Sequence, residues 1–151
     1  MSDRLRCHVT VAAVVPDAGR YLFVEERIAG RRVLNQPAGH LESGEDLLQA
    51  VVREVREETG LLFLPEVWLG CDLLSLRDGA VTLRIAVAGA TQPLAKPVER
   101  DPVIVATHWL TPAEATRFPL RSPLVLRSLQ RYEAGIRLPL ESLGTLLPGP
   151  E

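Results

Sequence analysis

The chain has 151 residues, of which 46% are hydrophobic and 24% are charged, and this composition is typical of one globular domain rather than of a disordered segment. The formal net charge of −2 argues against a protein that binds nucleic acid by neutralising many phosphates. The chain begins without the apolar run of a signal peptide and has no stretch of about 18 apolar residues, so we expect no membrane partner and a cytoplasmic location. Cys7 and Cys71 lack the CxxC spacing of a zinc site, which fits two reduced thiols.

The apolar pattern predicts two strands in the first part of the chain. Residues 9–15 (VTVAAVV) are mostly β-branched and apolar, as in a buried strand. Turn residues follow at 16–19 (PDAG), and residues 21–25 (YLFVE) predict a second strand, so we expect the two to pair as a hairpin. A short extended segment at residues 33–34 then leads into a loop at residues 35–39 (NQPAG).

The clearest helix pattern runs from Asp46 to Thr59. Asp46 can cap the first turn, with Gln49 at the spacing of a capping box, and Gly60 follows where the end of a helix favours glycine. Apolar residues recur at positions 48, 51 and 55, which gives the helix one apolar face.

The second half of the chain predicts three more strands and two helices. The strands are expected at residues 61–76, 81–87 and 103–110, with a turn at residues 77–79 (RDG) and a proline-rich loop at residues 91–102. Pro112 and Pro123 open the two helices, Gly135 ends the second, and the tail from Pro139 is expected to pack against the body. Together these elements predict an α/β fold in which helices cover both faces of a mixed sheet.

Three glutamates share one face of the helix at residues 46–59. Glu54, Glu57 and Glu58 stand at positions i, i+3 and i+4, and like charges at this spacing destabilise a free helix by about 0.2–0.5 kcal/mol per pair. They also lie near the C-terminus of the helix, where the helix dipole disfavours anions. One interpretation is a solvated, glutamate-rich face. The other is a cation site, since the hard oxygens of carboxylates suit Mg²⁺.

The residues around these glutamates complete a longer pattern. Its fixed positions are Gly39, Glu45, Arg53, Glu54, Val55, Glu57, Glu58, Gly60 and Leu61. This segment at residues 39–61 resembles the Nudix box, the signature of the Nudix hydrolase superfamily. The resemblance implies a single Nudix hydrolase domain over residues 1–151, with the fold of an α/β/α sandwich that contains a mixed β-sheet.

The resemblance also implies a reaction and a role for each residue of the box. The implied metal ligands are Glu54, Glu57, Glu58 and the backbone carbonyl of Gly39, which would hold Mg²⁺ or, in its place, Mn²⁺. Arg53 would orient the glutamates through charge-assisted hydrogen bonds, and Glu45 would support Arg53 or reach the metal through water. A metal-activated water would attack phosphorus in a phosphoanhydride bond, with Glu54 or Glu57 as the general base and Arg53 as a further catalytic residue.

Segments outside the box resemble one bacterial subgroup, the NudJ-type phosphatases. They lie at residues 8–12 (HVTVA), 35–42 (NQPAGHLE), 120–125 (LRSPLV) and 137–141 (RLPLE). This resemblance implies hydrolysis of nucleoside tri- and diphosphates and of hydroxymethylpyrimidine pyrophosphate, a thiamin precursor. The subgroup often has tryptophan where this chain has Leu34. If that ring stacks on a base, its loss would change the base preference.

Three residues near the box are candidate substrate contacts. Asn35 and Gln36 could bind a base or a phosphate, or satisfy backbone groups of their own loop. Arg27 belongs to a basic cluster with Arg31 and Arg32, which could clamp a phosphate or be a solvated loop. Acidic residues outside the box assist some Nudix enzymes, and the candidates here are Glu99, Asp101 and Glu114, although plain surface charge is the favoured interpretation of each.

Two other functions stay open from the sequence. The first is another Nudix substrate class, such as ADP-sugars, dinucleoside polyphosphates or oxidised nucleotides. The second is a non-catalytic nucleotide-binding regulator, although such modules usually lose box glutamates and this chain has all of them. In each case the expected partner is a small phosphorylated molecule, and the sequence does not choose between a monomer and a homodimer.

Overall fold

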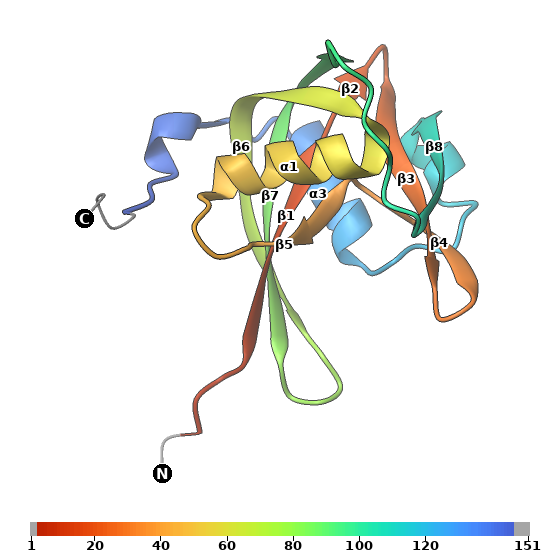
Figure 1. Cartoon of the computed structure of the whole chain (residues 1–151). Coiled ribbons are helices and arrows are strands. Elements are labelled where there is room, and N and C mark those ends of the chain that lie inside the picture. The colour runs from red at the N-terminus through yellow and green to blue at the C-terminus, as the bar shows by residue number, and fades with distance from the viewer. Residues whose placement is uncertain (1–2, 147–151) are drawn as a thin grey trace.

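Two β-sheets and three α-helices make up residues 3–146, the part of the chain that the computed structural model describes (Figure 1). The strands are β1 (Cys7–Val14), β2 (Pro16–Asp17), β3 (Arg20–Ile28), β4 (Arg31–Asn35), β5 (Ala38–His40), β6 (Leu61–Ser75), β7 (Val81–Pro93), β8 (Ile104–Leu110) and β9 (Leu138–Pro139). The helices are α1 (Leu47–Thr59), α2 (Pro112–Ala115) and α3 (Leu124–Glu133), followed by the 3-10 turn η1 (Leu140–Ser142). Among these described residues, no helix has the length and apolar character needed to cross a membrane.

A five-stranded mixed sheet forms the centre of the molecule, with the strand order β5-β1-β7-β6-β9. β1 and β7 run parallel, and the other neighbouring pairs are antiparallel. In the second sheet, β3 pairs with β2, β4 and β8, all antiparallel. The predicted α/β architecture with a mixed sheet is confirmed, although its strands divide between two sheets.

The predicted hairpin between the first two long strands is wrong. β1 is flanked on one side by β5 and on the other by β7, which pairs with it over all eight residues. β3 lies in the other sheet, and the turn at residues 18–19 joins it to the short strand β2 at residues 16–17. The turn occurs where the sequence predicts it, but β1 is not one of its arms because both edges of that strand are already hydrogen-bonded.

Helix α1 begins and ends where the sequence predicts. Asp46 is the N-cap and forms a capping box with Gln49, so the first free backbone N–H groups of the helix are bonded. Gly60 ends the helix with a φ of 73°, a left-handed conformation that glycine adopts without strain. These caps fix the helix over the end of β5, where the box loop lies (Figure 1).

Two hydrophobic cores cover the two faces of the five-stranded sheet. Side chains alternate between the faces along each strand. Val11 of β1 and Val87 of β7 pack with Val51 and the rest of the apolar face of α1. On the other face, Val14 packs with Val125 of α3. The central sheet therefore lies between α1 and α3, as in the α/β/α sandwich that the box resemblance implies.

The C-terminal elements largely follow the prediction. Thr111 and Glu114 form the capping box of α2, and Gly135 follows the end of α3 with a φ of 83°. The tail does pack against the body, since β9 pairs with β6 and Leu140 contacts the core beneath α1. One boundary differs, because residues 91–93 belong to β7 rather than to a loop and pair with the start of β6.

A network of ion pairs fixes α3 to β6. Asp72 accepts hydrogen bonds from Arg131 at 2.7 and 2.9 Å and from Arg127 at 3.1 Å. Arg131 also donates to the backbone carbonyls of Leu69 and Cys71. The hydrogen bonds with Arg131, more than any other contact, hold the pKa of Asp72 below its ordinary value.

Candidate active site

β5 and α1 meet at Gly39 and Glu54. Gly39 pairs with Val11 in the central sheet and lies directly against the carboxylate of Glu54 on α1. A β-carbon at position 39 would overlap this carboxylate. Glycine at this position therefore lets the Glu54 side chain reach the backbone of the loop, where the box resemblance places a metal-ligating carbonyl.

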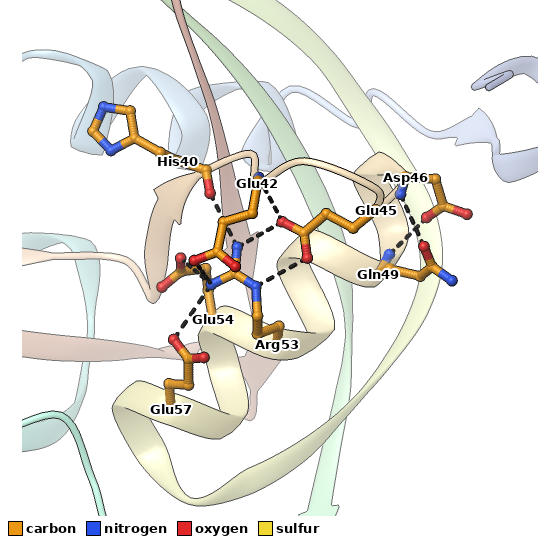
Figure 2. A network of polar contacts seen from close by, with 8 residues as sticks. All are labelled: His40, Glu42, Glu45, Asp46, Gln49, Arg53, Glu54 and Glu57. Atoms are coloured by element: carbon orange, nitrogen blue, oxygen red, sulfur yellow. Dashed lines mark hydrogen bonds and ion pairs between the residues drawn. The ribbon is translucent and has the colours of Figure 1, made fainter. Parts of the chain in front are cut away.

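Arg53 is the centre of a network of ion pairs between α1 and the loop that precedes it (Figure 2). Its Nε and Nη2 donate to the two carboxylate oxygens of Glu45, at 2.9 and 2.7 Å, in a bidentate pair. Its Nη1 donates to Glu54 at 2.7 Å and to Glu57 at 3.3 Å, while Nη2 also donates to the His40 carbonyl at 3.0 Å. These bonds, above all those with Glu45, raise the pKa of Arg53. Arg53 thus holds Glu54 and Glu57 together, and Glu45 in turn holds Arg53.

Glu58 is bound to the loop backbone instead of to Arg53. The residue is 4% exposed, and its Oε1 accepts a hydrogen bond from the N–H of Ala38 at 2.7 Å. Burial raises the pKa of Glu58 to about 9, and burial likewise raises the pKa of Glu54 to about 6. Both carboxyl groups therefore lie in surroundings that disfavour a negative charge unless a cation compensates for it.

The three box glutamates are not gathered around one point in this arrangement. Within residues 3–146, no three acidic, histidine or cysteine side chains are grouped as a metal site. The reason is that Arg53 holds Glu54 and Glu57, whereas Glu58 is held by the backbone. The box glutamates nevertheless suit a hard divalent cation, because they offer carboxylate oxygens close to the backbone of Gly39. A β-carbon at position 39 would fill the space that these oxygens need. Ion binding would replace some of the present contacts.

A pocket of about 380 Å³ adjoins the box loop and is lined by residues of both sheets. Its volume lies in the range of small-molecule sites. Ala38, Gly39 and His40 form the side next to the box, and Asn35 lies further along the same segment of chain. Two buried charged residues also line the pocket, Glu26 on β3 and Arg84 on β7.

Arg84 is a guanidinium held almost completely inside the protein, with 6% exposure. Its Nη1 donates to Gln36 Oε1 at 2.9 Å, and its Nη2 donates to Asn35 Oδ1 at 3.1 Å. Its Nε has no hydrogen-bond partner among the described residues, and burial lowers the pKa of Arg84 to about 10. Neither Arg84 nor Glu26 was predicted from the sequence, although a charged residue inside an apolar strand, as Arg84 is in VTLRIAV, is a signal of a special role.

The structure brings one of the three predicted substrate contacts, Asn35, to the pocket. Gln36 is 1% exposed and lies behind the pocket wall, where its amide donates to the Val125 carbonyl at 2.7 Å. Arg27 is exposed and follows Glu26 on β3, so its side chain points to the opposite face of the strand. The structure therefore places Gln36 and Arg27 outside the lining of the pocket, and their contact with substrate stays a prediction.

Leu34, where the NudJ-type subgroup often has tryptophan, faces the core rather than the pocket. Its side chain is fully buried and packs with Phe23 and Leu69. Its backbone N–H donates to the Pro119 carbonyl at 2.7 Å, which fixes the strand in this orientation. Leucine at this position therefore removes no stacking surface from the pocket of this protein.

The candidate acidic residues outside the box lie in two different places. The backbone N–H of Asp101 donates to the Glu57 carbonyl at 2.8 Å, and both residues line a shallow hollow that also includes Glu99. Glu114 instead caps α2 and pairs with Arg20 at 2.7 Å. Asp101 and Glu99 therefore lie beside the box helix, whereas Glu114 has a structural role.

Comparison with known proteins places the chain in one family. The chain matches the NUDIX domain over residues 6–129. It is 39% identical to phosphatase NudJ of Shigella boydii and of Escherichia coli K12 over 138 residues, which cover 91% of this chain and 90% of each relative. It is also similar to the solved structure of a Nudix hydrolase from Nitrosomonas europaea, with a TM-score of 0.88, 40% identity and coverage of 93% of this chain and 98% of that one.

The chain therefore belongs to the Nudix hydrolase family, enzymes that hydrolyse pyrophosphate bonds. Its similarity to phosphatase NudJ extends over most of both chains. Members of the family generally use divalent metal ions and act on small phosphorylated molecules, which agrees with the carboxylate donor set beside the pocket.

Proposed function

We propose that this protein is a Mg²⁺-dependent phosphatase that acts on nucleoside tri- and diphosphates and on hydroxymethylpyrimidine pyrophosphate. The observation that carries the proposal is the network of Glu45, Glu54 and Glu57 around Arg53, with Glu58 bound to the adjoining loop backbone, beside a pocket of about 380 Å³. The similarity to proteins named phosphatase NudJ supports the release of phosphate from such substrates. We further propose that the protein acts in the cytoplasm.

The box residues divide the work of the reaction. Glu54, Glu57, Glu58 and the Gly39 carbonyl are the groups that would hold Mg²⁺, and Mn²⁺ prefers the same oxygen ligands. When bound, the ion would lower the pKa of a water molecule and neutralise the phosphate oxygens. Arg53 keeps Glu54 and Glu57 within 2.7 and 3.3 Å of one nitrogen, so their carboxylates stay side by side. One of these two takes the proton of the attacking water.

The rest of the substrate would occupy the pocket. Because Ala38, Gly39 and His40 belong both to the box loop and to the pocket lining, a diphosphate bound at the loop leaves its organic part inside the pocket. Asn35 lines the same pocket and would be a polar contact for the organic part of the substrate.

A panel of diphosphates tests the proposal. ADP, GDP, hydroxymethylpyrimidine pyrophosphate and ADP-ribose are incubated with Mg²⁺, with Mn²⁺ or with EDTA, and the products are separated. We expect orthophosphate from the first three with either metal and none with EDTA. Cleavage of ADP-ribose without release of orthophosphate from ADP would instead show an ADP-sugar enzyme. Nucleotide binding without any turnover would show a regulator.

The variant Glu57→Gln tests the assigned chemistry. Glu57 is half exposed, so the substitution should leave the fold intact while lowering kcat by about 100-fold or more. Glu66→Gln is the matched control, since it makes the same exchange at an exposed position on β6. Undiminished activity of Glu57→Gln, measured as phosphate release at saturating Mg²⁺, would contradict the metal-ligand role.

A further inference from the structure

Glu26 places a carboxylate inside the pocket with few hydrogen bonds to the rest of the protein. The residue lies on β3 and is 6% exposed. Its Oε1 is 3.4 Å from Asn35 Nδ2, and its Oε2 is 3.9 Å from Arg121 Nε. Both separations exceed the length of a strong charge-assisted hydrogen bond, which is about 2.7–2.9 Å. Since a carboxylate has about four acceptor sites, Glu26 can still accept hydrogen bonds from a ligand.

Arg84 fixes the polar surroundings of Glu26 through Asn35. Because Arg84 Nη2 donates to Asn35 Oδ1, the amide oxygen is occupied and the NH₂ end of the amide points to Glu26. Arg84 itself is held by Gln36, which is anchored to the Val125 carbonyl. A continuous chain of hydrogen bonds therefore runs from the core to Glu26, so the carboxylate is positioned before a ligand arrives.

The surroundings of Glu26 favour an uncharged hydrogen-bond donor over a metal ion. Asn35 presents an N–H donor to the carboxylate, and Arg121 and Arg84 present positive charge, which opposes a second cation. The pocket walls also carry apolar side chains that suit a flat ring, namely Ile28, Leu74, Leu76, Val103 and Leu124. A heterocycle with an N–H donor on its edge matches both properties.

We propose that Glu26 selects substrates whose base carries an exocyclic amino group, by accepting a hydrogen bond from that group. The proposal rests on the proposed function, because it concerns the base of the same substrates. Cytosine and adenine carry an amino group where uracil and hypoxanthine carry a carbonyl oxygen, and an aminopyrimidine pyrophosphate belongs with the first two. The carboxylate attracts an amino group, whereas it repels a carbonyl oxygen because two acceptors then face each other.

Matched pairs of diphosphates test this selection in the unaltered protein. CDP is compared with UDP, and ADP with IDP, because each pair differs only at one edge of the base, where an amino group beside an acceptor nitrogen is replaced by a carbonyl oxygen beside an N–H group. We expect kcat/KM to favour the amino member by about tenfold or more in both pairs. Equal values within each pair would overturn the proposal, whatever the behaviour of any variant.

The variant Glu26→Gln tests whether Glu26 is the residue responsible. An amide can donate to a carbonyl as well as accept from an amino group, so the ratio for CDP over UDP should fall towards one. We expect a lower KM for UDP and, because a neutral amide accepts less strongly than a carboxylate, a higher KM for CDP. Glu25→Gln is the matched control, since the neighbouring carboxylate bonds to Arg32 and His108 instead of facing the pocket. We expect this control to keep the unaltered ratio. An equal loss for CDP and UDP in Glu26→Gln would overturn the proposal.

Binding without metal separates this inference from the proposed function. Calorimetric titration of CMP and UMP in EDTA should show tighter binding of CMP to the unaltered protein and a smaller difference for Glu26→Gln. If CMP is preferred but no diphosphate is hydrolysed, the phosphatase function fails and the selection by Glu26 is supported. If diphosphates are hydrolysed but CMP and UMP bind equally, the function stands and the selection is overturned.

Discussion

The buried position of Glu58 leads to a quantitative prediction for the protein without metal. Burial raises the pKa of this carboxyl from 4.5 to about 9, so at pH 7 the folded protein holds Glu58 protonated while the unfolded chain ionises it. Each pH unit above 4.5 then costs the folded state about 1.4 kcal/mol, or about 3 kcal/mol at pH 7. Glutamine keeps the oxygen that accepts from Ala38 and has no charge. Glu58→Gln should therefore raise the free energy of unfolding in EDTA by up to about 3 kcal/mol at pH 7.

The sign of the pH dependence follows from proton binding. Between pH 4.5 and about 9 the folded state binds one proton more at Glu58 than the unfolded state, so the stability of the unaltered protein falls as the pH rises. Below pH 4.5 both states are protonated and the penalty disappears. Glu54, with its pKa raised to about 6, contributes in the same direction over a narrower range, and it does so in both proteins.

Urea unfolding in EDTA at pH 5 and pH 8 measures this difference. We expect the variant to exceed the unaltered protein by about 1 kcal/mol at pH 5 and by about 5 kcal/mol at pH 8. Glu66→Gln, at an exposed position on β6, reports the effect of the same exchange in solvent. A stability difference that does not grow with pH, or a variant less stable than the unaltered protein, would refute the reasoning from burial.

Two further predictions concern one residue of the proposed active site, where activity should change, and one residue of the scaffold, where stability should change. Gly39→Ala puts a methyl group where the Glu54 carboxylate lies, so we expect kcat to fall by about 100-fold while the thermal unfolding midpoint stays nearly unchanged, because a flexible side chain can move aside. An active Gly39→Ala enzyme would show that the position of Glu54 is not critical. Asp72→Asn weakens the ion pairs with Arg131 and Arg127, so urea unfolding should show a loss of about 1–3 kcal/mol with unchanged kcat. An Asp72→Asn variant as stable as the unaltered protein would show that these ion pairs contribute little to the stability of the fold.

Local signals in the sequence were sufficient to predict the box helix but not to predict the pocket. The caps Asp46 and Gly60 and the apolar face of α1 lie within one short segment, so the bounds of the helix could be predicted. Glu26 and Arg84 meet only because β3 and β7, from two different sheets, face the same cavity. The incorrect hairpin has the same origin, because a turn signal shows where the chain reverses but not which strand becomes its neighbour.

The pocket is lined by two kinds of chain segment, one next to the box loop and one outside the box, and they differ in how far a substitution would disturb the box. Asn35 is separated from Gly39 by only three residues, so a substitution there also disturbs the loop that we propose binds the diphosphate. Glu26 and Arg84 lie on β3 and β7, which contain no residue of the box. With the role that we propose for Glu26, substitutions on these two strands can change the base preference while the box residues, which we propose act on the phosphoanhydride bond, keep their places.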